Sequence, residues 1–194
     1  LVLRVPDTWR YNIKKTWEAE TMMNETIKTL LERRSIRGYK KDLVPAEILD
    51  QILEAGEYAP SGMGMQGTMM VVTQNAELVA KLSQMNADVM GSGADPFYGA
   101  PTVVIVFADS EMGTCVENGS LVMGNLMNAA HALGVDSCWI HRAREVFDSP
   151  EGKALKAQWG VPESYVGIGH CVLGYRSGEY PEAKARKAGF VIRV

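Results

Sequence analysis

The chain has 194 residues, a formal net charge of −3 at pH 7 and a hydrophobic fraction of 46% beside 22% charged residues. This length favours one hydrophobic core, and this composition is typical of a folded globular protein rather than of a disordered one. A slightly acidic chain offers no basic field to attract a polyanion, so nucleic acid is not an expected partner.

The apolar runs, such as residues 103–108, are much shorter than the roughly 20 residues that a membrane-spanning helix needs. Residues 1–20 lack the continuous apolar centre of a secretory signal, so we expect a cytoplasmic protein. Cys115, Cys138 and Cys171 are odd in number and lack the CxxC spacing of a zinc ribbon, which predicts buried, reduced thiols. No metal site is expected.

Residues 1–21 show no helical or strand period and are expected to form an N-terminal extension of a domain that spans residues 22–194. From apolar spacing and from the positions of glycine and proline, helices are predicted over residues 24–34, 45–56, 76–90, 118–133 and 150–159. Strands are predicted over residues 68–73, 102–108, 137–140 and 166–173. The second strand is the most apolar and should be central in its sheet. Helices and strands do not alternate regularly, so an α+β sandwich is favoured over a doubly wound sheet.

One glycine pattern is misleading. Gly62, Gly64 and Gly67 in GMGMQG match the GxGxxG pattern of dinucleotide-binding proteins. That pattern binds a pyrophosphate only where it follows a strand and opens a helix. Here the glycines follow a predicted helix and precede a predicted strand, so a Rossmann site is not expected.

A cluster of cations follows the first predicted helix. The sequence RRSIR, residues 33–37, is termed the arginine segment and brings three guanidinium groups and one hydroxyl to the start of an extended stretch. Alternate side chains of extended chain share a face, so Ser35 and Arg37 can reach one ligand while Arg33 approaches from the helix end. A phosphate or another anion would fit there, and the alternative is a solvated cationic helix end.

The sequence ERRSIRGY, followed by a helix and then by APSGMGMQ, resembles the nitroreductase family that depends on flavin mononucleotide (FMN), over about residues 24–194. The resemblance implies an α+β fold in which helices sandwich a mixed β-sheet, and a homodimer with FMN at the subunit interface. It implies that Arg33, Arg34 and Ser35 hold the phosphate and ribityl chain of FMN. Arg37 would lie beside the pyrimidine edge, where a guanidinium stabilises the negative charge that arrives with hydride.

Residues 60–66, termed the glycine loop, match the second flavin segment of the family, which reaches the cofactor from the partner subunit. The implied contacts are Pro60, Ser61, Gly62 and Gln66. The chain departs from the family at Gly64, Gly67 and Thr68, where relatives often have Asn, Pro and Trp, so hydrogen bonds from the Asn position are not expected. The alternative for this loop is a plain helix-terminating turn.

Two later segments complete the implied site. Lys184 and Arg186 form a K-x-R pair similar to the second phosphate clamp of the family, and the alternative is a solvated charge run. Backbone amides near the reactive flavin nitrogen usually matter more than side chains in relatives. The segment that corresponds to that part of the family consists of Cys138, Trp139, Ile140 and His141.

Several polar residues have two interpretations. Asn86 corresponds to an Asn or Gln that contacts flavin in relatives, and its alternative is a polar position on an amphipathic helix. His141 can donate a proton, accept one or simply pack, and a lone histidine without a carboxylate partner is usually structural. His131 in a helix and His170 in the last strand are expected to be core residues.

The resemblance implies an enzyme in which NADH or NADPH reduces FMN and leaves, after which a small electrophile such as a nitroaromatic or a quinone takes the electrons. Relatives with the same fold also cleave a flavin, dehalogenate or oxidise azolines, and no residue selects these clearly. Two other classes stay open: a flavin-binding or redox-sensing module without turnover, and a helical interaction protein without cofactor. Bleaching of a bound flavin by NADH or NADPH separates the enzyme from the passive binder.

Overall fold

The computed structural model describes residues 24–194. The chain divides into two units, one ending at Glu32 and the other running over residues 33–194. The predicted N-terminal extension, residues 1–21, lies outside the described residues, and its boundary with the domain stays a prediction.

The described part of the first unit contains helix α2 (Glu25–Glu32). Asn24 begins it as predicted, because its Oδ1 accepts the N–H of Thr26 at 2.9 Å. The helix ends at Glu32, two residues before the predicted end at residue 34. The arginine segment therefore lies wholly in extended chain, in the second unit.

The second unit is built on a four-stranded sheet in the order β1-β2-β4-β3. Its strands are β1 (Thr68–Thr73), β2 (Thr102–Asp109), β3 (Asp136–Ile140) and β4 (Tyr165–Gly174). Neighbouring strands are all antiparallel. The parallel component is an isolated bridge between Ser35 and Ser137 at the free edge of β3. The strands lie where the sequence predicted them, and β2 is interior as expected.

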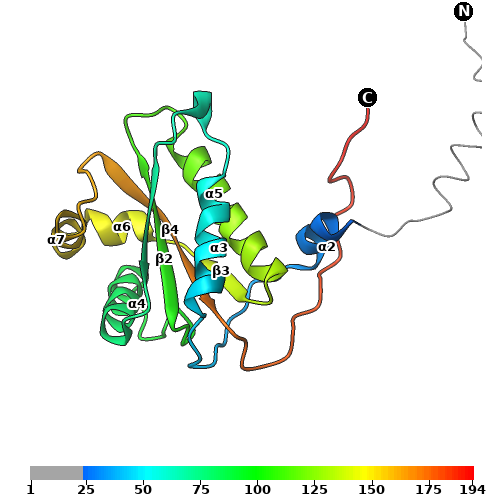
Figure 1. Cartoon of the computed structure of the whole chain (residues 1–194), viewed down its shortest axis with the longest axis horizontal. Coiled ribbons are helices and arrows are strands. Elements are labelled where there is room, and N and C mark those ends of the chain that lie inside the picture. Colours follow the sequence, from blue (N-terminus) through cyan, green and yellow to red (C-terminus); the bar gives the residue numbers. More distant parts are fainter. Residues whose placement is uncertain (1–23) are drawn as a thin grey trace, which may run out of the picture. The chain divides into compact units, whose positions relative to one another are not determined.

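Helices cover both faces of this sheet (Figure 1). On one face lie α3 (Ala46–Glu57) and α5 (Cys115–Ala132). On the other face lie α4 (Ala76–Met90), α6 (Ala143–Asp148) and α7 (Pro150–Gln158). The predicted α+β sandwich is therefore confirmed.

Strand β2 shows why its sequence is continuously apolar. Its alternate side chains pack into two different cores. Those on the α4 and α6 side are Val103, Ile105 and Phe107. Those on the α3 and α5 side are Val104, Val106 and Ala108. A strand buried on both faces has no solvent-facing position that a polar residue could occupy.

Two short elements were not predicted, namely α6 and the 3-10 turn η1 (Gly62–Gly64). Each has fewer than two full turns, too few for an apolar period to appear in the sequence. Helix α5 also begins at Cys115, three residues before the predicted start at Asn118.

His170 of β4 is fully buried, as predicted for a core residue. Its ring centroid lies 5.2 Å from that of Phe97 and 5.9 Å from that of Phe147. Burial in this aromatic cluster lowers the pKa of the imidazole to about 3. The folded protein therefore holds His170 in its neutral form.

We expect this histidine to make folding pH-dependent. The unfolded chain protonates His170 as pH falls through 6.5, whereas the folded chain resists protonation down to about 3. Stability should therefore be complete above pH 6.5 and decline below it, with a slope of at most about 1.4 kcal/mol per pH unit from this one group. Urea unfolding at pH 7.5 and pH 5 should show a smaller difference in His170→Phe than in the wild type. The exposed His141→Phe is the matched control, and an unchanged difference in His170→Phe would contradict the assignment.

Candidate functional site

The arginine segment lies along the free edge of β3. The N–H of Ile36 donates to the carbonyl of Ser137 at 3.0 Å, and the Ile36 side chain is buried in the α4 and α6 core. Neighbouring side chains in extended chain point to opposite sides. Ser35 is half-buried and Arg37 exposed, so burial follows this alternation. Ile36 thus anchors the segment while its two neighbours stay available to a ligand.

Three side chains of the segment act on the thiol of Cys138, the third residue of β3. Burial raises the pKa of this thiol above its usual range, and among the neighbouring groups Arg37 lowers it most. A hydrogen bond from Ser35 and the charge of Arg33 also lower it. The structure therefore brings the arginine segment and β3 together into one site. Because burial dominates, the thiol stays protonated and is a poor nucleophile.

Nη1 of Arg33 and Oγ of Ser137 are buried polar atoms at this site that have no hydrogen-bond partner within residues 24–194. An unpaired buried donor costs about 1–3 kcal/mol, and for that reason such atoms are rare in folded proteins. A ligand with several acceptor oxygens would satisfy both. Ser137 was not predicted, although it directly precedes Cys138 in GVDSC.

Asn86 holds the turn that follows β3. The side chain is fully buried; its Nδ2 donates to the carbonyl of His141 at 2.7 Å, and its Oδ1 accepts from Nε of Arg142 at 3.0 Å. Arg142 has a φ of 74°, a left-handed conformation that is uncommon for a residue with a Cβ. Protein groups occupy both ends of the Asn86 amide, so the observed contacts give it a positioning role. A direct contact with flavin stays a prediction.

The remaining residues predicted after Asn86 belong to β3 and its end. Cys138 and Ile140 point into the α4 and α6 core, while Trp139 packs on the opposite face. His141 has an exposed side chain, and its backbone carbonyl is the group that Asn86 holds. The backbone of this stretch is therefore fixed more firmly than the His141 ring.

The glycine loop lies at the opposite edge of the sheet from the arginine segment (Figure 1). It leads through η1 into β1, whereas the arginine segment bridges to β3, and these are the two edge strands. Four spacings of about 4.8 Å separate the two segments by at least roughly 19 Å across the sheet. One chain therefore does not close both segments on the same ligand.

The glycine loop is a structured turn. Gly62 donates its N–H to Oδ1 of Asn118 at 2.9 Å, and the N–H of Gln66 donates to Oγ of Ser61 at 3.0 Å. Pro60 and Gln66 are exposed, and Gln66 has a φ of 52°. No helix follows these glycines before β1, which confirms that the GxGxxG pattern here lacks Rossmann geometry. The anchor Asn118 was not predicted, because it lies 56 residues away in sequence.

Lys184 and Arg186 lie in an exposed C-terminal segment. The guanidinium of Arg186 donates from Nε and Nη2 to the carbonyl of Lys184, at 3.2 and 2.7 Å. The Arg186 guanidinium therefore bonds to the backbone of its own segment. The same segment is tied to the arginine segment further upstream, where the N–H of Arg34 donates to the hydroxyl of Tyr180 at 3.0 Å.

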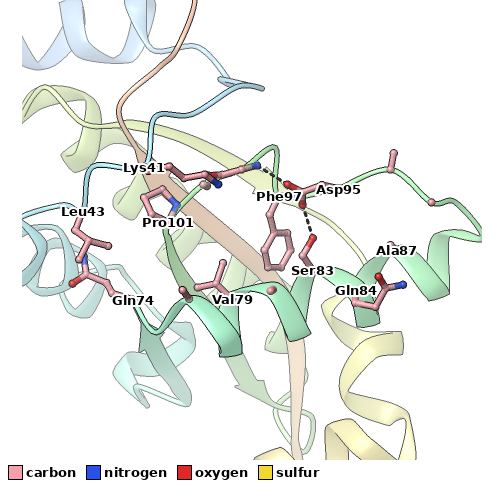
Figure 2. A pocket seen from close by; sticks show the side chains of 16 residues that line it. Lys41, Leu43, Gln74, Val79, Ser83, Gln84, Ala87, Asp95, Phe97 and Pro101 are labelled. Atoms are coloured by element: carbon pink, nitrogen blue, oxygen red, sulfur yellow. Dashed lines mark hydrogen bonds between the residues drawn. The ribbon is translucent and has the colours of Figure 1, made fainter.

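A large hollow of about 610 Å³ lies elsewhere, between α4 and residues 93–101 (Figure 2). Its polar side chains mostly bond within its own walls: Ser83 Oγ donates to Oδ1 of Asp95, and Oδ2 of Asp95 accepts the N–H of Gly99 at 2.6 Å. None of the predicted flavin residues lines it. The site of the arginine segment, with its two unpartnered polar atoms, is therefore the stronger candidate.

Within residues 24–194, no three His, Cys, Asp or Glu side chains are grouped so that they could hold a metal ion. In the same part of the chain, no helix is both long enough and apolar enough to cross a membrane.

Comparison with known proteins agrees with this fold. The model of the nitroreductase family matches residues 30–175, which include the arginine segment, the glycine loop and β3. The chain belongs to the nitroreductase family. This match confirms the resemblance expected from the sequence, and it ends before the Lys184 and Arg186 pair of this nitroreductase.

Individual nitroreductase relatives match most of the chain. A putative NADH dehydrogenase/NAD(P)H nitroreductase of Methanothermobacter thermautotrophicus is 31% identical, over 78% of this chain and 75% of the relative. A nitroreductase with bound FMN from Bacteroides fragilis has a TM-score of 0.82 and 32% identity, over 89% of this chain and 100% of that one. A second nitroreductase with bound FMN, from Desulfitobacterium hafniense, has a TM-score of 0.79 and 26% identity, with the same coverage of 89% and 100%.

Proposed function

We propose that this nitroreductase is an FMN-dependent oxidoreductase that moves electrons from NADH or NADPH to a small electrophilic acceptor such as a nitroaromatic or a quinone. The observation that carries the proposal is the pair of buried, unpartnered atoms, Arg33 Nη1 and Ser137 Oγ, beside the arginine segment of a family member. Two similar structures bind FMN. A relative from Bacillus subtilis, 36% identical over 85 residues, is named FMN reductase [NAD(P)H].

The residues present fit the phosphate of FMN. Arg33 and Ser137 offer buried donors without protein acceptors, and Ser35 lies on the same stretch. A phosphate dianion has enough acceptor oxygens for all of them and forms charge-assisted hydrogen bonds to guanidinium groups. Arg34 would add a further contact along the ribityl chain, and the Lys184 and Arg186 pair would add positive charge from the C-terminal segment.

When bound, FMN supplies two-electron chemistry between a nicotinamide and an acceptor. Arg37 is the residue of this chain that would tune it, since its exposed guanidinium lies on the side of the segment that Ser35 shares. A fixed positive charge at the pyrimidine edge favours the reduced flavin, where negative charge collects. Asn86 would hold the backbone at His141, at the end of the stretch over which the flavin ring would lie. No proton transfer is assigned to His141, whose side chain is exposed.

We propose the cytoplasm as the location of this protein. Cys115, Cys138 and Cys171 are free and buried. Free thiols persist in reducing compartments, which supports the proposal.

The purified protein should carry a yellow flavin, and anaerobic addition of NADH or NADPH should bleach it. A quinone or nitroaromatic added afterwards should restore the colour, because the acceptor takes the electrons back. Stopped-flow absorbance measures both half-reactions, with the Arg33→Ala protein freed of flavin as the control for non-specific oxidation. A bound flavin that neither nicotinamide reduces would favour the binding module, and a colourless protein that does not take up FMN would favour the cofactor-free alternative.

Variants of Arg33 and Arg37 should separate the affinity for FMN from the reduction potential of the bound flavin. Arg33→Ala should weaken FMN binding by about 1.5–3 kcal/mol, the worth of a charge-assisted hydrogen bond, and leave the potential of the bound flavin unchanged. Arg37→Ala should make that potential more negative and slow hydride transfer at saturating FMN. Redox titration of both variants beside Arg186→Ala, a phosphate-side control, measures the difference. Equal potentials in all three would remove Arg37 from the pyrimidine edge.

We also propose a homodimer in which the glycine loop of one subunit completes the arginine-segment site of the other. The separation of the two segments across the sheet supports this arrangement. So do the large exposed apolar side chains at the loop, with Met63 95%, Tyr58 80% and Met65 59% exposed. An obligate interface of this kind buries more than about 2,000 Å² and is rich in apolar groups.

Complementation tests the shared site directly. A Cβ at Gly62 would come within 2.4 Å of Oγ1 of Thr114, so Gly62→Val should disrupt the glycine loop. Homodimers of Gly62→Val or Arg33→Ala should both lose FMN at low flavin concentration. A mixed dimer of the two should recover one tightly bound FMN, since one of its two sites contains neither change. Light scattering that found a flavin-retaining monomer, or a mixed dimer without flavin, would contradict the arrangement.

A further inference from the structure

Tyr180 lies where three separate segments meet. Its ring stacks with that of His131 in α5, with centroids 6.0 Å apart and an interplanar angle of 18°. The guanidinium carbon of Arg176 lies 5.1 Å from the ring centroid, within the range of a cation–π contact. The Tyr180 ring is therefore in contact with an aromatic side chain of α5 and with a cation.

The cation that contacts Tyr180 is itself anchored. Arg176 donates its backbone N–H to Oδ2 of Asp136 at 2.9 Å, and its Nη1 lies 3.3 Å from the same carboxylate. Asp136 is buried and is the first residue of β3, next to Ser137. Through Arg176, the Tyr180 ring is thus linked to the start of β3, the strand that carries Ser137 and Cys138.

The hydroxyl of Tyr180 reaches the arginine segment. It accepts the backbone N–H of Arg34 at 3.0 Å, and it lies 3.4 Å from Nδ1 of His131. Arg34 separates Arg33 from Ser35, so a bond to its amide fixes the backbone from which both side chains project. Fixing that backbone orients the guanidinium whose Nη1 lacks a protein acceptor.

Tyr180 also limits where the C-terminal cations can lie. Lys184 is four residues further along, and a fully extended chain spans at most about 3.6 Å per residue, so its Cα lies within roughly 14 Å of that of Tyr180. Holding Tyr180 beside Arg34 therefore keeps Lys184 and Arg186 within reach of the same anion. If this part of the chain were untethered, bringing either cation to the anion would cost more conformational entropy.

We propose that Tyr180 is a positioning residue for FMN: its hydroxyl sets the arginine segment for the phosphate, and its ring tethers the segment that carries Lys184 and Arg186. This inference rests on the proposed function and adds a residue outside the part of the chain that the family model matches. Tyr180 does not touch the reacting atoms, so it acts on the affinity for phosphate and not on the chemistry of the flavin ring.

Binding of FMN and of riboflavin, which lacks the phosphate, tests this role. Quenching of flavin fluorescence is measured on flavin-free wild type, Tyr180→Phe, Tyr180→Ala and the control Tyr175→Phe. Tyr180→Phe removes one hydrogen bond and keeps the ring, so FMN affinity should fall roughly threefold to tenfold. Tyr180→Ala should weaken FMN further. Riboflavin affinity should change less than twofold in Tyr180→Phe, and Tyr175→Phe should match the wild type for both flavins.

Each result has a definite reading. A selective loss of FMN over riboflavin affinity, with the potential of the bound flavin unchanged, supports the positioning role. An equal loss for both flavins, or unchanged FMN affinity in Tyr180→Phe, overturns it. If the wild type bound and used FMN while Tyr180→Phe behaved identically, only this inference would fail. A wild type that took up no FMN would instead overturn the proposed function.

Discussion

The backbone hydrogen bond from Ile36 to Ser137 is the contact on which the candidate site depends. It attaches the arginine segment to the edge of β3, and the burial of Ile36 in the core keeps that attachment from slipping. A slip by one residue would exchange the faces, sending Ile36 outward and its polar neighbours into the core. Because the apolar core forbids that exchange, Ser35 and Arg37 are held on the side opposite to Ile36. The geometry of the site is thus a consequence of hydrophobic burial.

The order of the strands keeps the glycine loop and the arginine segment of one chain apart. Placing β1 and β3 at opposite edges sends the glycine loop and the arginine segment to different sides of the molecule. The arginine segment has a buried donor without a partner among residues 24–194, and the glycine loop has exposed residues in left-handed conformation at Met63 and Gln66. In the proposed homodimer, a second subunit would bring the two kinds of segment together without any change in the fold.

The buried polar groups of the candidate site differ in whether they have partners within the protein. Asn86 satisfies both ends of its amide within the protein and so stabilises the left-handed Arg142. The Arg33 Nη1 and Ser137 Oγ atoms have no partner among residues 24–194 and are the groups proposed to bind the FMN phosphate. Tyr180 and Asp136 make their bonds within the protein, Tyr180 to the N–H of Arg34 in the arginine segment and Asp136 to the N–H of Arg176. Rigid backbone beside unsatisfied donors is the arrangement expected of a preorganised anion site.

Much of the fold followed from local pattern alone. The strands β1 and β2 and the helices α3 and α4 lie within a residue or so of their predicted bounds, because each is long enough to display its period and has a glycine, proline or capping residue on at least one side. The motifs RRSIR and APSGMGMQ were enough to indicate the family, which the comparison confirmed. Helix α6 and the turn η1 were not predicted, because elements this short show no apolar period in the sequence.

What only the tertiary structure decided is how distant segments meet. The sequence determined that residues 33–37 are a cationic stretch and that Asn86, Ser137 and Tyr180 are polar, but these properties do not specify partners. Asn86 and Arg142 are 56 positions apart, and Arg34 and Tyr180 are 146 apart. Such pairings depend on strand order and on which edge of the sheet each segment joins. Local preference encodes neither, because contacts of that range are set by the packing of the whole core.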